Sequence, residues 1–252
     1  RNALTEEKYK DLAVAFSAEG FKVDSILYND EAADRLTAEL LKYDAVLVWV
    51  NPIEQGHERK RLDALLLEIA NKGCFVSTHP EVILKMGTKD VLYKTKEMDW
   101  GGDIKMYSSY EDFIRRFPES LQKSGTRVLK QYRGNGGDGV FKIKKCPADK
   151  QVTIIHATEG TKESVLSTND FNNEFRKFFL NDGLLIDQEW NSNIVNGMVR
   201  CYLSGTKVAG FGYQEINALY ELNGKTWLPG KRYYYTENCG LFADLKEIME
   251  DK

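Results

Sequence analysis

The chain contains 252 residues, which is enough for one large domain or two modest ones. Hydrophobic residues make up 42% and charged residues 29%, a globular balance, and 35 basic against 38 acidic residues give a net charge of -3. This charge gives no general electrostatic case for nucleic-acid binding, and no apolar run approaches the roughly 18 residues of a membrane span. The four cysteines and three histidines are scattered without a CxxC pair, which argues against structural zinc and favours reduced thiols and a cytoplasmic location.

The first 80 residues alternate between helical and strand patterns. Helical faces are predicted around Tyr9–Phe16, Leu36–Leu41 and Leu62–Ile69, and strands at Phe21–Tyr28, Asp44–Asn51 and Cys74–Ser77. The continuous apolar run within 44–51 is typical of a strand buried on both faces of a parallel sheet. We therefore expect a doubly wound parallel α/β unit over residues 1–80. Because the unit begins on a helix and the chain does not begin with Met, we expect a strand to precede Arg1 in the intact protein.

The pattern changes after His79-Pro80. Helices are predicted near Lys89–Lys94 and from Ser109, where Asp112 completes a capping box. From Thr126 onward most segments alternate like strands, interrupted by a helix that carries Phe171, Phe175, Phe178 and Phe179 and closed by a helix over 241–250. The predicted strands are Thr126–Tyr132, Val140–Lys144, Gln151–His156, Leu184–Trp190, Met198–Leu203 and Lys207–Tyr213. The second part is therefore expected to be an antiparallel α+β region.

The segment 128–143 carries the strongest chemical signal, because four glycines fall within six residues: Gly134, Gly136, Gly137 and Gly139. Glycines this dense let backbone N–H groups approach a phosphate without obstruction by Cβ atoms. A Rossmann or Walker loop would lead into a helix, whereas this loop leads into the strand-like Val140-FKIKK and lacks Gly-Lys-Ser/Thr. The order fits a flap folded over a triphosphate, with Lys130 on the incoming strand. The alternative is a flexible hairpin with solvated lysines, in which Lys130 only protects a sheet edge.

Several runs together resemble the ATP-grasp superfamily, and more closely a family of bacterial ATP-grasp-like proteins without an assigned reaction. These runs are LVWVNPI (47–53), HPEVILKMGTKDVLYKT (79–95), RVLKQYRGNGGDGVFKI (127–143), LLIDQEW (184–190) and GMVRCYLSGTKVAGFGYQEINAL (197–219). The resemblance spans nearly the whole chain and implies binding of ATP. It also implies three segments: an N-terminal α/β domain over 1–80, a subdomain with the flap over 81–186, and an incomplete C-terminal subdomain over 187–252.

The resemblance also assigns roles to individual residues. Lys89 and Lys130 match lysines that reach the nucleotide phosphates, and the four glycines match the flap over the β- and γ-phosphates. Asp187, Gln188 and Glu189 match a hinge that holds the ribose with an acid and reads adenine with backbone groups. Strand alternation places Asp187 and Glu189 on one face, so Gln188 is expected to contribute mainly its backbone. Arg200 matches a catalytic cation that faces the transferred phosphate; without the resemblance, Lys89 and Arg200 would be interpreted as solvated surface residues.

The magnesium ligands are the main departure from the superfamily pattern. ATP-grasp enzymes hold Mg²⁺ with an acid on one late strand and a Glu-x-Asn pair on another. Glu215-Ile-Asn217 has these residue types but follows the 197–213 hairpin immediately, so the metal ligands stay unassigned. We expect the acid-rich strands to lie beyond Lys252, in a chain shortened at both ends.

Three functions from different classes remain open at this point. The first is an ADP-forming carboxylate–amine or carboxylate–thiol ligase that uses ATP and Mg²⁺ and passes through an acyl-phosphate. The second is a nucleotide-binding or interaction module without turnover. The third, a dinucleotide-dependent oxidoreductase, is disfavoured because no GxGxxG follows a predicted strand. The sequence leaves the carboxylate substrate and the oligomeric state undetermined.

Overall fold

The computed structural model describes residues 7–50, 58–98, 101–134, 136–148, 150–160, 162–220 and 230–251. The chain divides into two compact units, Arg1–Gly87 and Thr88–Lys252. The further division at residue 186 remains a prediction. Of the 47–53 run, residues 51–53 lie outside the described residues, as does Lys252.

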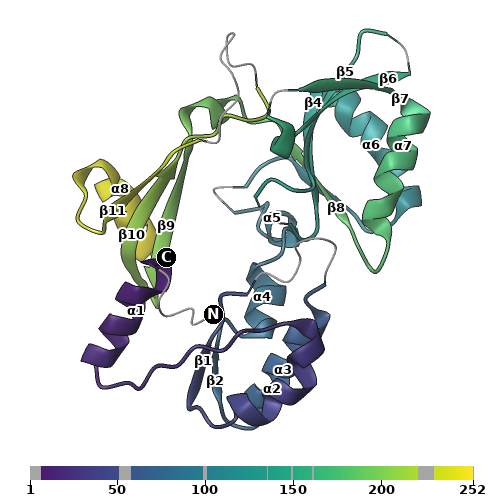
Figure 1. Cartoon of the computed structure of the whole chain (residues 1–252). Coiled ribbons are helices and arrows are strands. Elements are labelled where there is room, and N and C mark those ends of the chain that lie inside the picture. The colour runs from purple at the N-terminus through teal and green to yellow at the C-terminus, as the bar shows by residue number, and fades with distance from the viewer. Residues whose placement is uncertain are drawn as a thin grey trace. The chain divides into compact units, whose positions relative to one another are not determined.

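The first unit places helices against a short parallel sheet (Figure 1). Strand β1 pairs in parallel with β2. Leucines of α2 and α3 pack with Val76 to form a buried core, against which Ile26 and Tyr28 also pack. The elements are α1 (Glu7–Ala18), α2 (Ala33–Leu40), β1 (Ala45–Leu47), α3 (Lys60–Asn71), β2 (Phe75–Ser77) and α4 (Pro80–Met86).

Two expectations for this unit are wrong. Residues 21–28 form no strand, because among the described residues they pair with no neighbouring strand and instead lay Ile26 and Tyr28 on the helical core. The 44–51 run is not buried on both faces: Leu47 is 37% and Trp49 54% exposed, whereas Val46 and Val48 pack on the core. The alternation of a strand buries one side of this run only. In the described part of the unit, the sheet therefore has two parallel strands, β1 and β2, in place of the larger doubly wound sheet that we expected.

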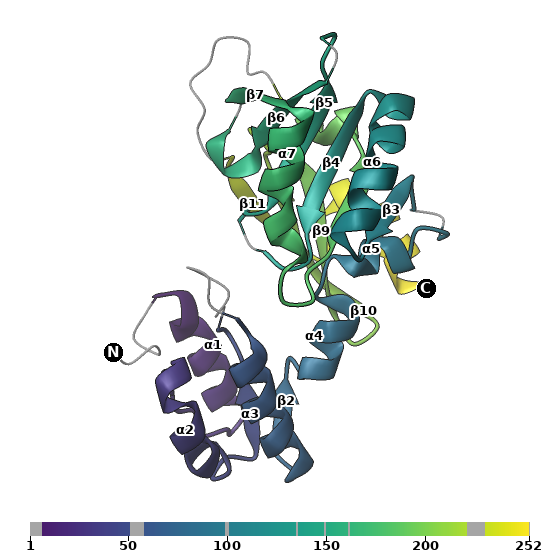
Figure 2. The same ribbon diagram turned by 90° about the vertical axis from the view of Figure 1, so that its right-hand side faces the viewer.

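The second unit contains a six-stranded antiparallel sheet in the order β3-β8-β4-β5-β6-β7. Helices α6 and α7 lie on one face of it (Figure 2). Their phenylalanines, among them Phe113 and Phe175, pack with Leu129 and Leu185 of the sheet in one core. The elements are α5 (Asp90–Lys94), β3 (Ile104–Tyr107), α6 (Tyr110–Ser124), β4 (Thr126–Gln131), β5 (Val140–Lys145), β6 (Gln151–His156), β7 (Glu163–Ser167), α7 (Thr168–Phe175) and β8 (Leu185–Glu189).

A second antiparallel sheet in this unit has the order β11-β10-β9. One of its faces packs on the segment leading into α8, where the Phe242 ring lies 4.8 Å from Phe211 and 5.3 Å from Tyr235. The elements are β9 (Met198–Ser204), β10 (Lys207–Gln214), β11 (Arg232–Thr236) and α8 (Ala243–Glu250).

The six strands predicted from Thr126 onward all form, with ends within one residue of those expected. Ser109 caps α6 through the Asp112 N–H, as the capping box predicts. The helix extends over 15 residues because Phe113, Phe117 and Leu121 recur on one buried face. Strands β3, β7 and β11 were not predicted, since each is a run of only four or five residues with weak alternation.

Candidate functional site

Strands β4 and β8 carry two contrasting sets of side chains. They pair antiparallel, with Leu129 opposite Asp187 and Val128 opposite Gln188. Alternation along each strand sends Asp187 toward α6 and α7 and Gln188 to the other face. The face turned away from the two helices therefore presents Lys130 and Gln188 together.

Lys130 is held by a neutral partner in a half-buried position. Its Nζ donates a hydrogen bond of 2.6 Å to Oε1 of Gln188. Burial, together with the nearby positive charge of Lys89, lowers the pKa of Lys130 to about 8. A partly buried ammonium group that is held by a neutral oxygen would be stabilised by an anion bound from outside the protein.

Lys89 approaches the same region from the residue that precedes α5. Its backbone N–H donates to Tyr132 O at 3.1 Å, and its Nζ donates to Gly134 O at 3.3 Å. Burial lowers the pKa of Lys89, an effect that the charge of Asp138 partly opposes. The buried Asp90 fixes the start of α5, because it accepts from Thr88 Oγ1 and pairs with Lys94 at 2.6 Å.

The glycine-rich segment forms the predicted strand–loop–strand hairpin between β4 and β5. Gly136, Gly137 and Gly139 have positive φ values of 63°, 94° and 62°, which favour glycine. The side chain of Gln131 fills the inside of the hairpin: a Cβ on Gly139 would lie 2.1 Å from its Cδ, and one on Gly134 would lie 2.6 Å from its Nε2. The absence of a Cβ at Gly134 and Gly139 therefore leaves room for the Gln131 side chain, and it also leaves the backbone N–H groups of the hairpin accessible.

The hinge expectation needs correction at Asp187 and Gln188. Asp187 is fully buried and accepts hydrogen bonds from Arg127 Nε at 2.6 Å and from Tyr107 and Ser120 hydroxyls at 2.7 Å. Because Asp187 is fully buried under α6 and both its oxygens are engaged, the structure gives no support to its predicted role as a ribose acceptor. Gln188 contributes its side chain to Lys130 rather than only its backbone. Glu189, on the same strand, is exposed.

Beyond the hinge, the buried Lys142 links the two sheets of the unit. Its Nζ lies 3.5 Å from the centroid of the Trp190 ring and donates to Leu219 O at 2.8 Å. Leu219 also donates its N–H to Gly160 O at 2.9 Å. These contacts join β5 and the segment after β8 to the segment that follows β10.

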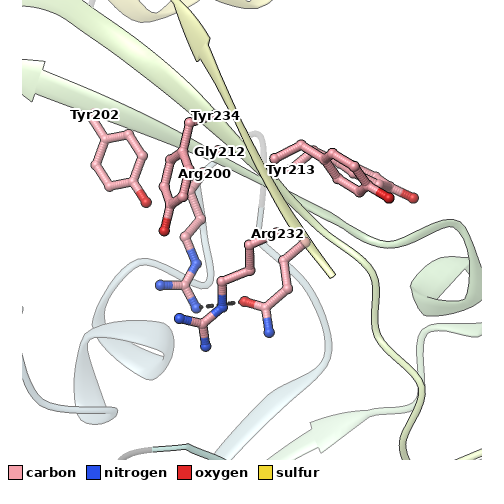
Figure 3. A pocket seen from close by; sticks show the side chains of 8 residues that line it. Arg200, Tyr202, Gly212, Tyr213, Arg232 and Tyr234 are labelled. Atoms are coloured by element: carbon pink, nitrogen blue, oxygen red, sulfur yellow. Dashed lines mark hydrogen bonds between the residues drawn. The ribbon is translucent and has the colours of Figure 1, made fainter. Parts of the chain in front are cut away.

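Arg200 lies on the three-stranded sheet, and no described contact joins it to Lys89 or Lys130. Figure 3 shows its side chain beside that of Arg232, and both residues line a shallow hollow that is open to solvent. Arg200 Nη2 donates to Gln214 Oε1 at 3.2 Å. The hollow is lined by Arg200, Tyr202, Gly212, Tyr213, Gln214, Arg232, Tyr233 and Tyr234.

The described residues do not assemble the expected magnesium ligands. Glu215 accepts from Lys231 N–H at 3.1 Å with one oxygen and from the Tyr233 hydroxyl at 3.3 Å with the other. It therefore ties the end of β10 to the start of β11. Within the described ranges, no three His, Cys, Asp or Glu side chains gather in a way that could hold a metal ion. Glu215 and Asn217 consequently do not form a metal site that the structure supports.

Sequence reasoning missed Arg232, Tyr234 and the side-chain role of Gln188. The run Arg232-YYYT was a visible signal, since its alternation places Arg232 and Tyr234 on one face, but β11 was not predicted. The side-chain role of Gln188 was missed because the resemblance gave the side-chain role in the hinge to an acidic residue. Only the pairing of β4 with β8 brings Gln188 against Lys130.

Comparison with known proteins adds one structural likeness. No protein-family model matches the chain, and no curated protein matches it significantly. Among solved structures, the crystal structure of D-cycloserine synthetase DcsG matches with a TM-score of 0.56 and 10% sequence identity, covering 90% of this chain and 70% of that one. In the described residues no helix is long and apolar enough to cross a membrane. At this identity the likeness concerns the fold alone, and it supports an ATP-grasp-like fold for this chain.

Proposed function

We propose that the protein binds ATP on the face of the six-stranded sheet that carries Lys130, and acts as an ADP-forming ligase of the ATP-grasp type. The observation that carries the proposal is the pair of lysines at the glycine hairpin. Both amines are held by neutral oxygens, from Gln188 and from the Gly134 carbonyl, and both pKa values are lowered by burial. Such a cluster is electrostatically prepared for a polyphosphate.

The hairpin supplies the second element of a phosphate site. Gly136 and Gly137 adopt left-handed conformations, and successive N–H groups in such turns form concave anion sites. Lys89 already contacts this hairpin through Gly134, so a phosphate bound there would meet both the amine and the backbone donors. Lys130 would neutralise charge from the sheet side.

The reaction we propose is phosphoryl transfer followed by acyl transfer. A substrate carboxylate oxygen attacks the γ-phosphorus, the bond to the β,γ-bridging oxygen breaks, and ADP leaves with that electron pair. An amine or thiol then attacks the acyl carbon, loses its proton, and displaces inorganic phosphate with the C–O electron pair. Positioning and charge neutralisation by lysine and arginine carry such chemistry without a side-chain nucleophile. The superfamily uses Mg²⁺ in this chemistry, but the described residues do not assemble ligands for it.

Binding is tested by calorimetric titration of ATP, ADP and NAD into the full chain. We expect adenosine phosphates to bind in preference to NAD, and NAD binding alone would overturn the proposal. Turnover is tested by following ADP formation with a panel of carboxylates and hydroxylamine, which traps an acyl-phosphate as a hydroxamate. Carboxylate-dependent hydroxamate that Lys130→Ala abolishes, and Lys144→Ala does not, is the expected result.

A second candidate is a nucleotide-binding module without turnover. The engagement of both Glu215 oxygens within the β10–β11 connection favours it, because this acid is then not available for a metal–nucleotide complex. Tight ATP binding without ADP formation across the panel would select this function over the ligase.

A further inference from the structure

The three-stranded sheet has two unlike faces. Phe211 and Tyr235 on one face pack against Phe242. The opposite face carries Arg200, Gly212 and Tyr234 in one cross-strand row, with Gln214 paired with Arg232 in the next. Figure 3 shows the two guanidinium groups extending side by side from this face.

The hollow on this face exists because its centre is a glycine. A Cβ on Gly212 would lie 3.1 Å from the Tyr202 hydroxyl oxygen and 3.2 Å from its Cε2. Any larger side chain would therefore fill the floor. With glycine there, the two arginines, with Tyr202 and Tyr234 beside them, border a shallow hollow that is open to solvent.

The lining has an excess of positive charge and of hydrogen-bond donors. Among the described residues, neither Arg200 nor Arg232 forms an ion pair, and the recorded acceptor for Arg200 is the neutral Gln214 amide. No carboxylate belongs to the residues that line the hollow. Two adjacent guanidinium groups match two anionic groups, and each can hold a carboxylate through paired N–H donors.

We propose, resting on the ligase function above, that this hollow is the acceptor subsite and that it takes a dicarboxylate rather than an amino acid that carries an ammonium group in place of the second carboxylate. Arg232 holds one carboxylate, and Arg200 lies beside the second, which is the one to be phosphorylated. An ammonium group on the substrate would meet two guanidinium groups and no acid, so amino acids are disfavoured.

Calorimetric titration of three four-carbon probes tests this assignment: succinate, butyrate and 4-aminobutyrate, with inorganic phosphate as a fourth arm. We expect succinate to bind tightest and 4-aminobutyrate weakest. Arg232→Gln and Gly212→Ala should each weaken succinate binding on the order of tenfold, the first by removing a charged donor and the second by filling the floor. Arg115→Gln, on the exposed face of α6, is the matched control and should change nothing.

The outcomes separate this inference from the ligase proposal. AMP-PNP affinity should stay within about twofold in Arg232→Gln and Gly212→Ala, because neither residue belongs to the lysine cluster. If AMP-PNP binds in a Lys130-dependent way but succinate does not bind, only the subsite assignment fails. If AMP-PNP does not bind, the ligase proposal fails. Equal binding of phosphate and succinate, or of 4-aminobutyrate and succinate, would overturn the dicarboxylate assignment, as would a thermally stable Arg232→Gln protein with unchanged succinate affinity.

Discussion

The two faces of the six-stranded sheet treat buried charge in opposite ways. On the face under α6 and α7, Arg127 is fully buried and pairs with Asp187 at 2.6 Å and with Asp103 at 2.9 Å. On the other face, Lys130 and Lys89 are held by neutral oxygens. Arg127 and Lys130 both lie on β4, and Asp187 and Gln188 are neighbours on β8, so strand alternation turns the two pairs to opposite faces. A buried cation paired with carboxylates serves the fold, whereas a cation held by neutral oxygens points to a ligand.

The largest expected effect is on the compensated face. Asp187→Ala should lower the free energy of unfolding by about 3–5 kcal/mol, because it leaves the buried Arg127 guanidinium without its closest acidic partner. The Tyr107 and Ser120 hydroxyls lose their acceptor as well. Urea unfolding measures the change, and Glu189→Ala on the same strand is the exposed control. A loss below about 1 kcal/mol would mean that this network adds little to the fold.

Lys130→Ala should instead act on binding. We expect nucleotide affinity to fall by about 1.5–3 kcal/mol, the usual worth of a charge-assisted contact, with no loss of folding stability. The folded protein bears a desolvation cost for the Lys130 ammonium, whose hydrogen-bond partner Gln188 is neutral, and the substitution removes that cost. Calorimetry against Lys144→Ala, a lysine on β5 paired with Glu163, provides the comparison. Unchanged nucleotide affinity would reduce Lys130 to a structural residue.

The pH dependence follows from the lowered pKa of Lys130, about 8 in the folded protein against 10.5 in a model peptide. A bound polyphosphate favours the ammonium form, so binding near pH 9 should take up close to one proton, and affinity should fall as pH rises above 8. The unfolded chain binds more protons at Lys130 between about pH 8 and 10.5, so the wild type should gain stability over Lys130→Met in this window. Calorimetry in two buffers of different ionisation enthalpy, with pH-dependent melts, tests both signs. Proton release on binding contradicts the prediction.

The smallest expected effect concerns the hairpin. Amides of Gly136 and Gly137 should exchange with deuterium more slowly once ATP is bound, because a glycine turn orders best against a partner. Hydrogen-exchange mass spectrometry on free and ATP-bound protein measures this, with the amides of α6 as an internal reference. Equal exchange rates in the free and the ATP-bound protein would argue that the hairpin is a preformed turn and not a flap that orders over the nucleotide.

Gln131 offers a sharper form of that test. Its side chain lies inside the hairpin and donates from Nε2 to Asp138 Oδ2 at 3.2 Å. Gln131→Ala should speed exchange at Gly136 and Gly137 in the free protein, while the exposed change Gln122→Ala should not. A hairpin indifferent to Gln131 would show that the glycines alone set its conformation.

Local pattern predicted much of the second unit. Alternation predicted six of the strands from Thr126 onward, Ser109 predicted the start of α6, and glycine density identified the hairpin. Pattern was less successful in the first unit, where residues 21–28 alternate like a strand but find no partner among the described residues. A strand is completed by hydrogen bonds to another segment, so its own sequence is not sufficient.

The sequence by itself predicted most elements of the second unit, because periodicity is a local property, and it pointed to phosphate as the ligand of the lysines beside the glycine-rich turn. Tertiary structure decided which charges meet. The register of β4 against β8 buries Asp187 with Arg127 and turns Gln188 to Lys130, and the pairing of β11 with β10 places Arg232 on the face that carries Arg200. These pairings join residues tens of positions apart, and a shift of one residue in either sheet would exchange the faces and reverse every assignment.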